Sequence, residues 1–576
     1  MGLLKKDSPI FINTQIFMTN QKHKTRILVC SESSKVSSGF GTYNKALLKG
    51  LFESNKYEIA EFASYGLIGD KEKFNIPWKY YPNAIEKDDK REQLYNSSPE
   101  NQFGKWRFDR VVLDFKPEIV IDIRDYWMSA YQRFSPLRKY FHWILMPTID
   151  SFPQKEEWLD TYINANAVFT YSDWGAEVLK QQTSNKIKYI STASPAANAS
   201  SYQQVSLAQK QEIKGSLALS KDNIVIGTVM RNQKRKLFPE LIQAFEALVD
   251  RLRNEQSEKS NQIILYLHTS YPDAGWDMFE LIKNSKVSNK IYFTYWCRSC
   301  NAIFASNLAG FTQKCYKCKQ KSAIIPNVGN AIGEAALGKI MSIFDVYVQY
   351  SICEGFGMPQ VEASYCGVPV LTVNYSAMED MIKKINAQPI KLGLKFKELE
   401  TGAIRVYPDK DDTVDKLYSL IHKPQNILAK IGFTNKNLAT NEYSWQDTVQ
   451  KWMDYIDTVD TDYYRSRWEN MSYQQIPTIN INPEIRDKTV YEQIYSLHNQ
   501  FKSTGLDMST YWLLKNIYFA QNSMLYDGAS VVSYSINNII KDINSIITNY
   551  NNVEYARCNP SLLTSEDFID YANKTT

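Results

Sequence analysis

Short apolar runs alternate with amphipathic helical segments over most of this chain, in two separate series. The first series has its strand-like runs at 25–32, 57–63, 118–123, 140–147, 167–170 and 186–191. Runs that are apolar throughout, rather than at every second residue, are typical of parallel strands covered by helices on both faces. The chain therefore predicts an α/β fold, with a first doubly wound domain over residues 25–200.

A second series begins after 194–214, a stretch of small and polar residues that predicts a linker. Its strand-like runs read NIVIGTVMRN, IILYLHTS, KIYFTYW, VYVQYS and VPVLTV. We expect a second Rossmann-like domain over 215–455, interrupted by a cysteine-containing insertion at 297–325. Two such domains joined by a linker place a ligand in the cleft between them, at the carboxyl ends of the strands.

The two ends of the chain lack this alternation. Residues 1–24 are polar and aperiodic, which predicts a tail. Residues 457–576 lose the strand pattern and show helical spacing at 490–501 and 530–550, which predicts a helical C-terminal extension.

Composition limits the class of protein. The chain has 576 residues, with 67 Lys+Arg against 62 Asp+Glu, so a strongly basic, histone-like binder is excluded. No apolar run approaches the ~18 residues that a membrane span needs, and the first residues contain no apolar signal-peptide core. We expect a cytoplasmic protein, of a bacterium or of a phage-infected host cell.

The segment 353–371, CEGFGMPQVEASYCGVPVL, combines a glycine-rich turn with a predicted helix start. It carries two carboxylates, Glu354 and Glu362, and the glycines Gly355 and Gly357 allow a ligand to approach the backbone closely. Amides at a helix start, with the positive end of the helix dipole, suit an anionic diphosphate. The two carboxylates can accept hydrogen bonds from sugar and ribose hydroxyls. The alternative is an ordinary strand–turn–helix with two solvated glutamates.

Two further segments carry groups suited to an anionic ligand. The run 227–236, GTVMRNQKRK, ends a predicted strand and supplies Arg231 and Lys236, with Arg235 as a third candidate. The alternative for this run is a solvated basic loop. After the first strand, the turn 37–42 contains Gly39 and Gly41, which let a phosphate or an acceptor approach.

Together these segments closely resemble the retaining, GT-B-fold glycosyltransferases of family 4, the group 1 type with the E-x7-E motif. The resemblance covers about 25–455. It implies that Glu354 contacts the donor sugar, that Glu362 binds the ribose hydroxyls, and that Arg231 and Lys236 clamp the donor diphosphate without a catalytic metal. It also implies a set of donor-binding backbone positions: Gly355, Phe356, Gly357, Met358, Gly39 and Gly41.

Many members of that family carry histidine at the N-terminal strand ends that face the donor. Here those ends read DIRDYW at 122–127 and PTID at 147–150. Asp125 and Asp150 are therefore candidates to orient or deprotonate the acceptor hydroxyl, with a helix cap or another structural role as the alternative. His142 lies inside an apolar run, which predicts a packed core side chain.

The insertion at 297–325 contains two CxxC pairs, a spacing typical of a tetrahedral zinc ribbon. The four candidate ligands are Cys297, Cys300, Cys315 and Cys318. We expect structural zinc here, with a redox-active dithiol as the alternative. The segment 297–321 contains several basic and aromatic residues and no acidic residue. That composition fits either a flap over the donor base or a nucleic-acid contact.

These observations predict a retaining glycosyltransferase whose co-substrate is a nucleotide-diphosphate sugar. The acceptor hydroxyl belongs either to a glycan or small molecule, or to a hydroxylated base in phage-type DNA reached through the basic insertion. Two other functions stay open from the sequence. One is a GT-B nucleotide-sugar epimerase, and the other is a catalytically inactive zinc-ribbon protein that binds nucleic acid.

Overall fold

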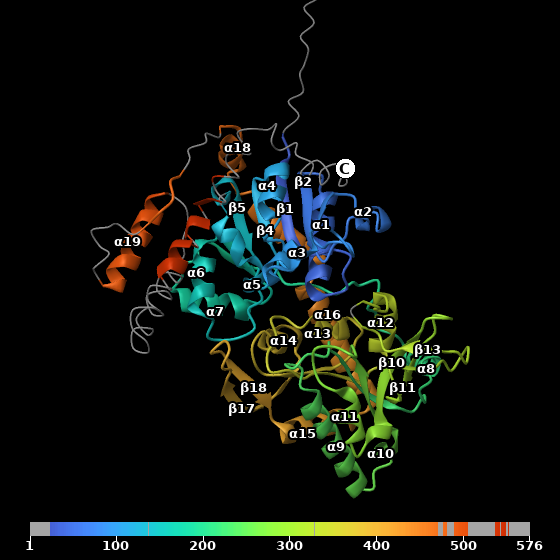
Figure 1. Ribbon diagram of the computed structural model, residues 1–576. Helices are drawn as coiled ribbons and strands as arrows, with labels where there is room; N and C mark the ends of the chain where they lie inside the picture. Colours follow the sequence, from blue (N-terminus) through green and yellow to red (C-terminus); the bar gives the residue numbers. More distant parts are fainter. Residues whose placement is uncertain are drawn as a thin grey trace, which may run out of the picture.

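The structure, a computed structural model, describes residues 23–135, 137–327, 329–470, 476–480, 489–504, 536–541, 543–545, 547–548 and 551. Two α/β domains lie one above the other, the N-terminal domain drawn in blue to cyan and the C-terminal domain in green to orange (Figure 1). The expected tail, 1–24, lies almost entirely outside the described residues.

The N-terminal domain contains one parallel sheet of seven strands in the order β3-β2-β1-β4-β5-β6-β7. The strands are β1 (Thr25–Glu32), β2 (Tyr57–Ser64), β3 (Lys79–Pro82), β4 (Ile119–Asp122), β5 (His142–Leu145), β6 (Ala167–Thr170) and β7 (Ile190–Thr192). Six of them were predicted, whereas β3 was not, because its four residues, KYYP, are too short and mixed to form a distinct apolar run.

Helices cover both faces of this sheet. They are α1 (Gly39–Glu53), α2 (Asp70–Lys73), α3 (Glu92–Asn96), α4 (Phe108–Phe115), α5 (Tyr126–Ser129), α6 (Glu156–Asn164) and α7 (Asp173–Thr183). Successive residues of a strand point to opposite faces. In β1, Val29 packs with α1 residues in one core cluster, and Cys30 packs with α4 residues in another. This explains why the strands are apolar throughout.

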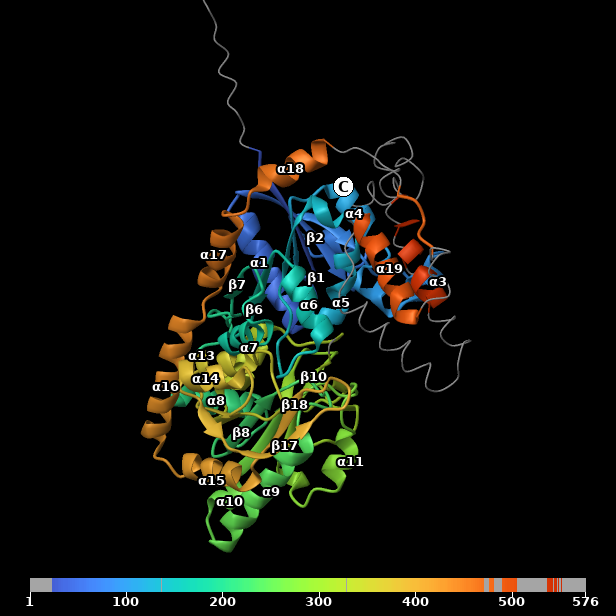
Figure 2. The ribbon, with the colours of Figure 1, turned by 90° about the vertical axis from the view of Figure 1, so that its left-hand side faces the viewer.

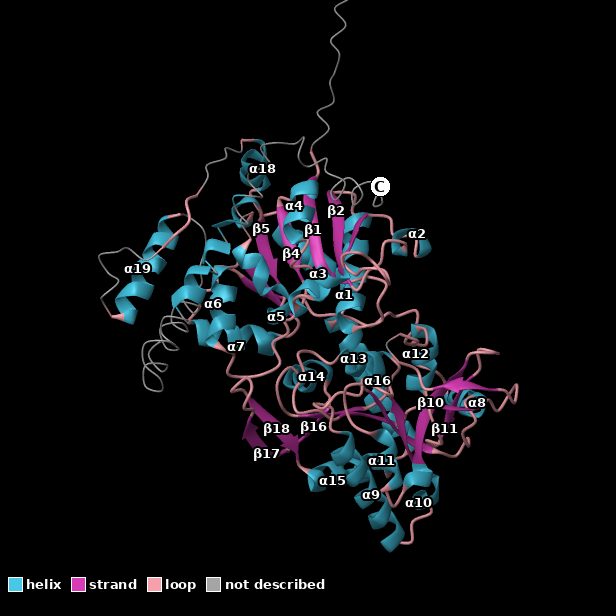
Figure 3. Ribbon diagram, viewed as in Figure 1, coloured by secondary structure: helices cyan, strands magenta, loops and turns pink. Residues whose placement is uncertain are grey.

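The C-terminal domain contains a nine-stranded sheet with the order β12-β13-β10-β9-β8-β14-β15-β16, to which β11 adds beside β10. The strands are β8 (Ile224–Val229), β9 (Ile263–His268), β10 (Ile291–Cys297), β11 (Ile303–Ser306), β12 (Thr312–Lys314), β13 (Lys321–Ile324), β14 (Val346–Gln349), β15 (Val370–Val373) and β16 (Gln388–Ile390). A separate hairpin, β17 (Leu392–Lys397) and β18 (Ile404–Pro408), was not predicted. Figure 3 shows the strands of both domains in magenta.

The helices of this domain are α8 (Leu207–Ser216), α9 (Phe238–Asn254), α10 (Lys259–Gln262), α11 (Met278–Lys283), α12 (Glu334–Ser342), α13 (Met358–Tyr365), α14 (Met378–Ile385), α15 (Lys410–Ile421) and α16 (Gln425–Glu442). The expectation that all of 194–214 is a linker is wrong. Its second half forms α8, which starts with a capping box in which the Ser206 and Gln209 side chains each bond the other's backbone amide.

The insertion at 297–325 continues the C-terminal sheet instead of forming a separate unit. Strands β11 and β13 pair antiparallel with β10, and β12 pairs antiparallel with β13 at the sheet edge. Cys297, Phe304 and Cys315 are buried in one core cluster together with apolar side chains from the other helices and strands of the domain. The insertion therefore shares the domain's hydrophobic core, and its position is defined by that packing.

Helix α17 and the first helix of the predicted extension return to the N-terminal domain. After α16 the chain forms α17 (Trp445–Ile456) and α18 (Thr461–Glu469); Figure 2 shows α16 and α17 along one side of the molecule and α18 across the top. Trp452 stacks on Phe169 of β6 at 4.0 Å between ring centroids, and its indole N–H donates to Tyr43 at 2.8 Å. Thus α17, expected in the second domain, packs on the first.

The predicted helix at 490–501 is α19 (Val490–Ser503). The predicted helix at 530–550 falls partly outside the described residues, and the described positions between 536 and 548 are helical. Among the helices that the structure describes, none combines the length and the apolar composition required to cross a membrane.

Candidate active site

Lys236 and Glu354 form a buried ion pair at the carboxyl end of the C-terminal sheet. Lys236 follows β8, and Glu354 follows the neighbouring strand β14. The two loops are held together by backbone hydrogen bonds, including Leu237 N to Tyr350 O at 3.1 Å. The prediction that these two segments share a site therefore has a direct structural basis.

The Glu354 carboxylate is fixed through one of its oxygens. Oε1 accepts hydrogen bonds from Lys236, from Gln349 Nε2 at 2.7 Å and from Ser351 Oγ at 2.7 Å. Burial raises the pKa of Glu354, but the positive charges of Lys236 and Arg235 outweigh burial, so the pKa lies below its usual value. Glu354 is ionised, and within the described part of the chain no donor bonds its Oε2.

Helix α13 begins directly after the glycine-rich turn, as predicted. Gly357 precedes it with φ +89°, a conformation that favours glycine. A Cβ at Gly355 would overlap the Cγ2 of Thr148 from the N-terminal domain. Phe356 is buried against Tyr443, with ring centroids 5.3 Å apart, and Met358 starts the helix. The turn is therefore shaped by contact with the opposite domain as well as by the helix.

The three basic candidates occupy different surroundings. Arg231 makes a two-point ion pair with Asp273, at 2.8 and 3.0 Å, and its side chain is 49% exposed. Within the described residues the Arg235 guanidinium makes no hydrogen bond or ion pair. Its pKa is nevertheless raised, because nearby acidic groups, Glu354 first among them, outweigh its own burial. Arg235 is therefore the basic candidate whose charge is not paired with a carboxylate of the described residues.

The turn at 37–42 is part of a helix, not the loop that the sequence predicts. Ser38 caps α1 by accepting from Gly41 N at 3.0 Å, and its hydroxyl donates to Glu32 at the end of β1. Gly41 lies against the carbonyl of Val36, where a Cβ would overlap, whereas Gly39 borders open space. The glycines thus form the first turn of a 15-residue helix.

A buried carboxylate that sequence reasoning missed anchors this turn. Glu61 of β2 accepts from the amide of Ser34 at 2.7 Å and from its hydroxyl at 2.9 Å, and also from Trp78 at 2.7 Å. The only sequence signal was an acidic residue inside an otherwise apolar strand, YEIAEFAS. Glu61 positions the loop before α1 and does not itself border the site residues.

Asp125 and Asp150 both lie on the face of the N-terminal domain that meets the C-terminal domain. Burial raises the pKa of Asp125 to about 6, opposed by a hydrogen bond from Thr148 and reinforced by Asp150. Asp150 is committed to an ion pair with Arg405 of β18, Oδ1 to Nη1 at 3.1 Å. Asp125 is therefore the carboxylate of the two that has no ion-pair partner among the described residues. Arg405 is, after Glu61, the second residue here that sequence reasoning missed.

Glu362 lies on α13 and, unlike Glu354, has no cationic partner among the described residues. Burial raises its pKa to about 7, and the neighbouring Glu334 adds to this, while a hydrogen bond with Tyr202 lowers it. Tyr202 belongs to the segment that was expected to be linker, and it is buried. The two glutamates of the motif thus differ in charge state near neutral pH.

Two other expectations can be compared with the structure. His142 is packed as predicted: Nε2 lies 2.9 Å from the Tyr455 hydroxyl, and burial lowers its pKa to about 4. Cys353 lies outside both CxxC pairs, a position that predicts a small buried hydrophobe; it is buried but lies in a polar network. Its sulfur is 2.9 Å from Arg405 Nη1 and 3.3 Å from Asp150 Oδ2.

A pocket of about 340 Å³ opens at the interface between the domains. Its lining residues are Phe152, Tyr375, Lys395, Phe396, Lys397 and Ile404. Phe152 comes from the N-terminal domain, and its carbonyl oxygen accepts a hydrogen bond from Ile404 N at 2.9 Å. The pocket is therefore closed on one side by the same interface that contains Asp150 and Arg405.

The four predicted ligand cysteines come together as one cluster. All four sulfurs lie within 4.8 Å of one another, and Cys297 to Cys318 and Cys300 to Cys315 are 3.6 and 3.7 Å apart. A tetrahedron with Zn–S bonds of ~2.3 Å has sulfurs about 3.8 Å apart, and a disulfide would need about 2.0 Å. The closest sulfurs come from different CxxC pairs, so the cluster fits a tetrahedral metal ion better than a dithiol.

Comparison with known proteins agrees with this architecture. Residues 309–432 match the family described as Glycosyl transferases group 1. No curated protein sequence matches the chain significantly. Among solved structures, sucrose-phosphate synthase from Thermosynechococcus elongatus is similar with a TM-score of 0.53 and 13% identity, over 76% of this chain and 98% of that one.

Two further structures are similar at comparable levels. HepE from Anabaena, in complex with UDP and glucose, has a TM-score of 0.51 and 13% identity, over 76% of this chain and 100% of that one. WaaG, a glycosyltransferase involved in lipopolysaccharide biosynthesis, has a TM-score of 0.51 and 8% identity, over 75% and 100%. Two doubly wound domains with these neighbours define the GT-B fold. With the matched group 1 domain, they identify the protein as a glycosyltransferase of that architecture.

Proposed function

We propose that this protein is a retaining glycosyltransferase that moves a sugar from a nucleotide-diphosphate sugar to an acceptor hydroxyl. The observation that carries the proposal is the buried Lys236–Glu354 pair, in which no donor from the described part of the chain bonds Glu354 Oε2. An ionised carboxylate with one oxygen fixed and the other free is suited to accept a hydrogen bond from a sugar hydroxyl. The UDP-and-glucose complex of HepE supports a donor of this class.

Three elements are suited to hold the donor diphosphate. The amides of Gly355, Phe356, Gly357 and Met358 precede or begin α13, where the positive end of the helix dipole attracts an anion. Arg235 supplies a cation that has no ion-pair partner among the described residues, and Lys236, paired with Glu354, supplies a second. Glu362, one helical turn further on, is placed to accept ribose hydroxyls. These charges make a metal at the diphosphate unnecessary.

In the proposed reaction, the acceptor oxygen attacks the anomeric carbon from the side on which the diphosphate leaves. The new C–O bond forms as the bond to the phosphate oxygen breaks, and that phosphate oxygen takes the acceptor's proton. Asp125 orients the acceptor hydroxyl, with Asp150 beside it. The protein contributes orientation and electrostatic stabilisation of the leaving diphosphate.

Zinc is the metal that we propose for the four-cysteine cluster, because it accepts four thiolates in a tetrahedron and needs no open coordination position. Its role is structural, since Cys297 and Cys315 belong to the domain core. For the acceptor we retain two classes, a glycan or small hydroxyl compound and a hydroxylated base in DNA.

Donor hydrolysis by the purified protein tests the proposal. Nucleotide sugars are first screened by thermal shift, because a bound donor stabilises the folded state. The best donor is then assayed with wild type, Lys236→Ala, Glu354→Ala and the exposed control Arg251→Ala. We expect hydrolysis to fall at least about 100-fold in the first two variants only. Normal hydrolysis in both would show that the site is assigned wrongly, and an isomerised donor as the product would identify an epimerase.

A further inference from the structure

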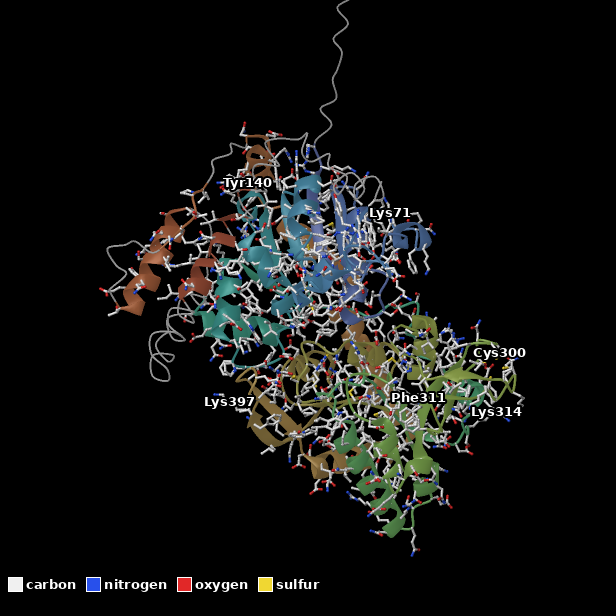
Figure 4. All side chains as sticks on the ribbon, in the orientation of Figure 1. Lys71, Tyr140, Cys300, Phe311, Lys314 and Lys397 are labelled. Carbon is white, nitrogen blue, oxygen red and sulfur yellow. The ribbon has the colours of Figure 1, made fainter. Side chains whose placement is uncertain are left out.

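The cysteine insertion carries a concentrated positive charge that the proposed transfer reaction does not use. Five basic side chains lie between residues 297 and 321, and no acidic one lies there. They are Arg298, Lys314, Lys317, Lys319 and Lys321, and all five are exposed. Within the described residues none of the five is in an ion pair. Figure 4 shows Cys300 and Lys314 at one margin of the C-terminal domain, with Lys397 on its opposite side.

Two of these lysines are pairing partners on neighbouring strands. In the antiparallel pair β12–β13, Lys314 pairs with Lys321 at a shift in register that follows Gln313. Like charges at directly opposed positions destabilise a sheet, and this pair has no acidic neighbour within the insertion to offset the repulsion. A bound anion would turn the unfavourable pair into a favourable one. The arrangement is therefore better explained by a ligand than by stability.

The proposed metal lowers this charge without cancelling it. Four thiolates with one Zn²⁺ carry a charge of about −2, against five positive side chains, so the insertion keeps about +3. The sulfurs also hold the turn between β12 and β13, because Cys315 and Cys318 lie on it. Lys317 and Lys319 lie on this turn, so the four lysines all fall within 314–321.

Two exposed aromatic side chains belong to the same insertion as the lysines. The Phe311 side chain is 52% exposed, and one of its faces stacks on Tyr271 with the ring centroids 5.3 Å apart. Tyr316 is 42% exposed, and its hydroxyl donates to Ser216 O at 3.0 Å. A half-exposed ring held by such contacts in a cationic segment offers a stacking surface for nucleic-acid bases.

We propose that the cysteine insertion binds nucleic acid, with phosphates on Lys314, Lys317, Lys319 and Lys321 and a base stacked on Phe311. A polysaccharide would satisfy the lysines alone, whereas the exposed ring favours a ligand with planar bases. Because β8, β9 and β10 are parallel, the insertion begins at the sheet edge that also carries Lys236. A bound strand would lie beside the active site, and this binding does not depend on the transfer reaction.

Fluorescence anisotropy with a labelled 20-nucleotide single-stranded DNA tests the proposal on the zinc-loaded full chain. We expect saturable binding whose log K falls with log salt at a slope of about −3, the value for four phosphate contacts to a single strand. In Lys314→Ala/Lys321→Ala the slope should become less steep by about 1.4, because two phosphate contacts are lost. Binding should weaken at least about tenfold at 50 mM salt. Phe311→Ala should weaken binding without changing the slope.

The control is Lys395→Ala/Lys397→Ala, which removes two exposed lysines from a strand on the other side of the same domain. It should leave binding unchanged, and donor hydrolysis should be unchanged in the Lys314/Lys321 variant. Equal losses in both double variants would show general charge attraction and overturn the proposal. No binding at 50 mM salt would also overturn it. Equal competition by heparin and by unlabelled DNA, with no effect of Phe311→Ala, would assign the site to anionic polysaccharides instead.

Discussion

Asp150 of the N-terminal domain and Arg405 of the C-terminal domain form an ion pair across the interface between the domains, Oδ1 to Nη1 at 3.1 Å. Arg405 also binds Glu398 of its own domain at 3.0 Å and contacts the sulfur of Cys353, the residue before Glu354. One guanidinium thus connects the two domains directly beside the candidate active site. A second connection, Lys384 to Asp173 at 2.7 Å, lies elsewhere on the interface.

Removing this guanidinium is expected to weaken both stability and domain closure. Arg405 is 8% exposed and its two carboxylate partners are each 27% exposed, so Arg405→Ala should cost about 1–3 kcal/mol, less than a fully buried pair. Urea unfolding measures the loss, and small-angle scattering should show a larger radius of gyration. Arg251→Ala, which removes exposed ion pairs with Asp415 and Glu255, should cost much less than Arg405→Ala. Equal costs would contradict the assignment.

The close approach of Gly355 to Thr148 predicts that a harmful substitution at Gly355 is compensated by a smaller side chain at position 148. Gly355→Ala should lower donor hydrolysis at least about tenfold, because the new Cβ overlaps Thr148 Cγ2 and pushes the domains apart. Thr148→Ser removes that methyl group but keeps the hydroxyl that bonds Asp125. The double variant should therefore recover most of the activity. A double variant as inactive as Gly355→Ala would place the defect in the turn itself.

Asp125 should control the acid limb of the pH–rate profile. Its pKa is raised to about 6, chiefly by burial, so the ionised form that orients the acceptor is lost below that pH. We expect kcat/KM to rise as pH increases towards 6 and to level off above it. Asp125→Asn should be slower and should lose this limb, whereas Asp150→Asn should keep it. An unchanged limb in Asp125→Asn would exclude Asp125 from this role.

Glu362 should make stability depend on pH. Its pKa is about 7 in the folded protein and near 4.3 when unfolded, so the folded state binds the proton more tightly. The contribution is favourable at low pH and is lost as pH rises from about 4.5 through 7, by at most about 4 kcal/mol. Glu362→Gln should therefore be more stable than wild type at pH 8 and similar at pH 4.5. Parallel unfolding curves for Glu379→Gln, a glutamate that is 32% exposed and paired with Lys383, provide the control.

The cysteine cluster should hold one zinc ion per chain. Mercuric displacement of the thiolates should release one equivalent, detected with a colorimetric zinc indicator. Cys297→Ser should lose the metal and lower the melting temperature, because Cys297 lies in the domain core. Cys366→Ala, a buried cysteine outside the cluster, should retain the metal. Full zinc occupancy in Cys297→Ser would contradict the assigned ligand set.

Much of the architecture followed from the sequence. Continuous apolar runs predicted eleven of the strands, because a strand that is buried on both faces has few polar residues and stands out from its surroundings. The four cysteines followed from their spacing, since each CxxC pair brings its two sulfurs close to one metal. The start of α13 followed from the Gly-Met-Pro sequence at 357–359, which the backbone geometry there requires.

Other features had no local signal. Strands β3, β17 and β18 are short or half-exposed, so their patterns resemble loops. Helix α17 has an ordinary amphipathic pattern, and nothing in that pattern says which domain its apolar face covers. Arg405 and Glu61 gain their roles from partners distant in the sequence.

The sequence by itself determined the two doubly wound domains, the metal-type cysteine pairs and the carboxylate and basic groups that we propose for donor binding. These are properties of short segments, where periodicity and spacing act directly. The tertiary structure decided which partners the candidates have. Arg231 is held by Asp273 and Asp150 by Arg405, whereas neither Arg235 nor Asp125 is in an ion pair among the described residues. It also placed Lys314 opposite Lys321, because strand register is set by pairing across the sheet and cannot be read along one strand.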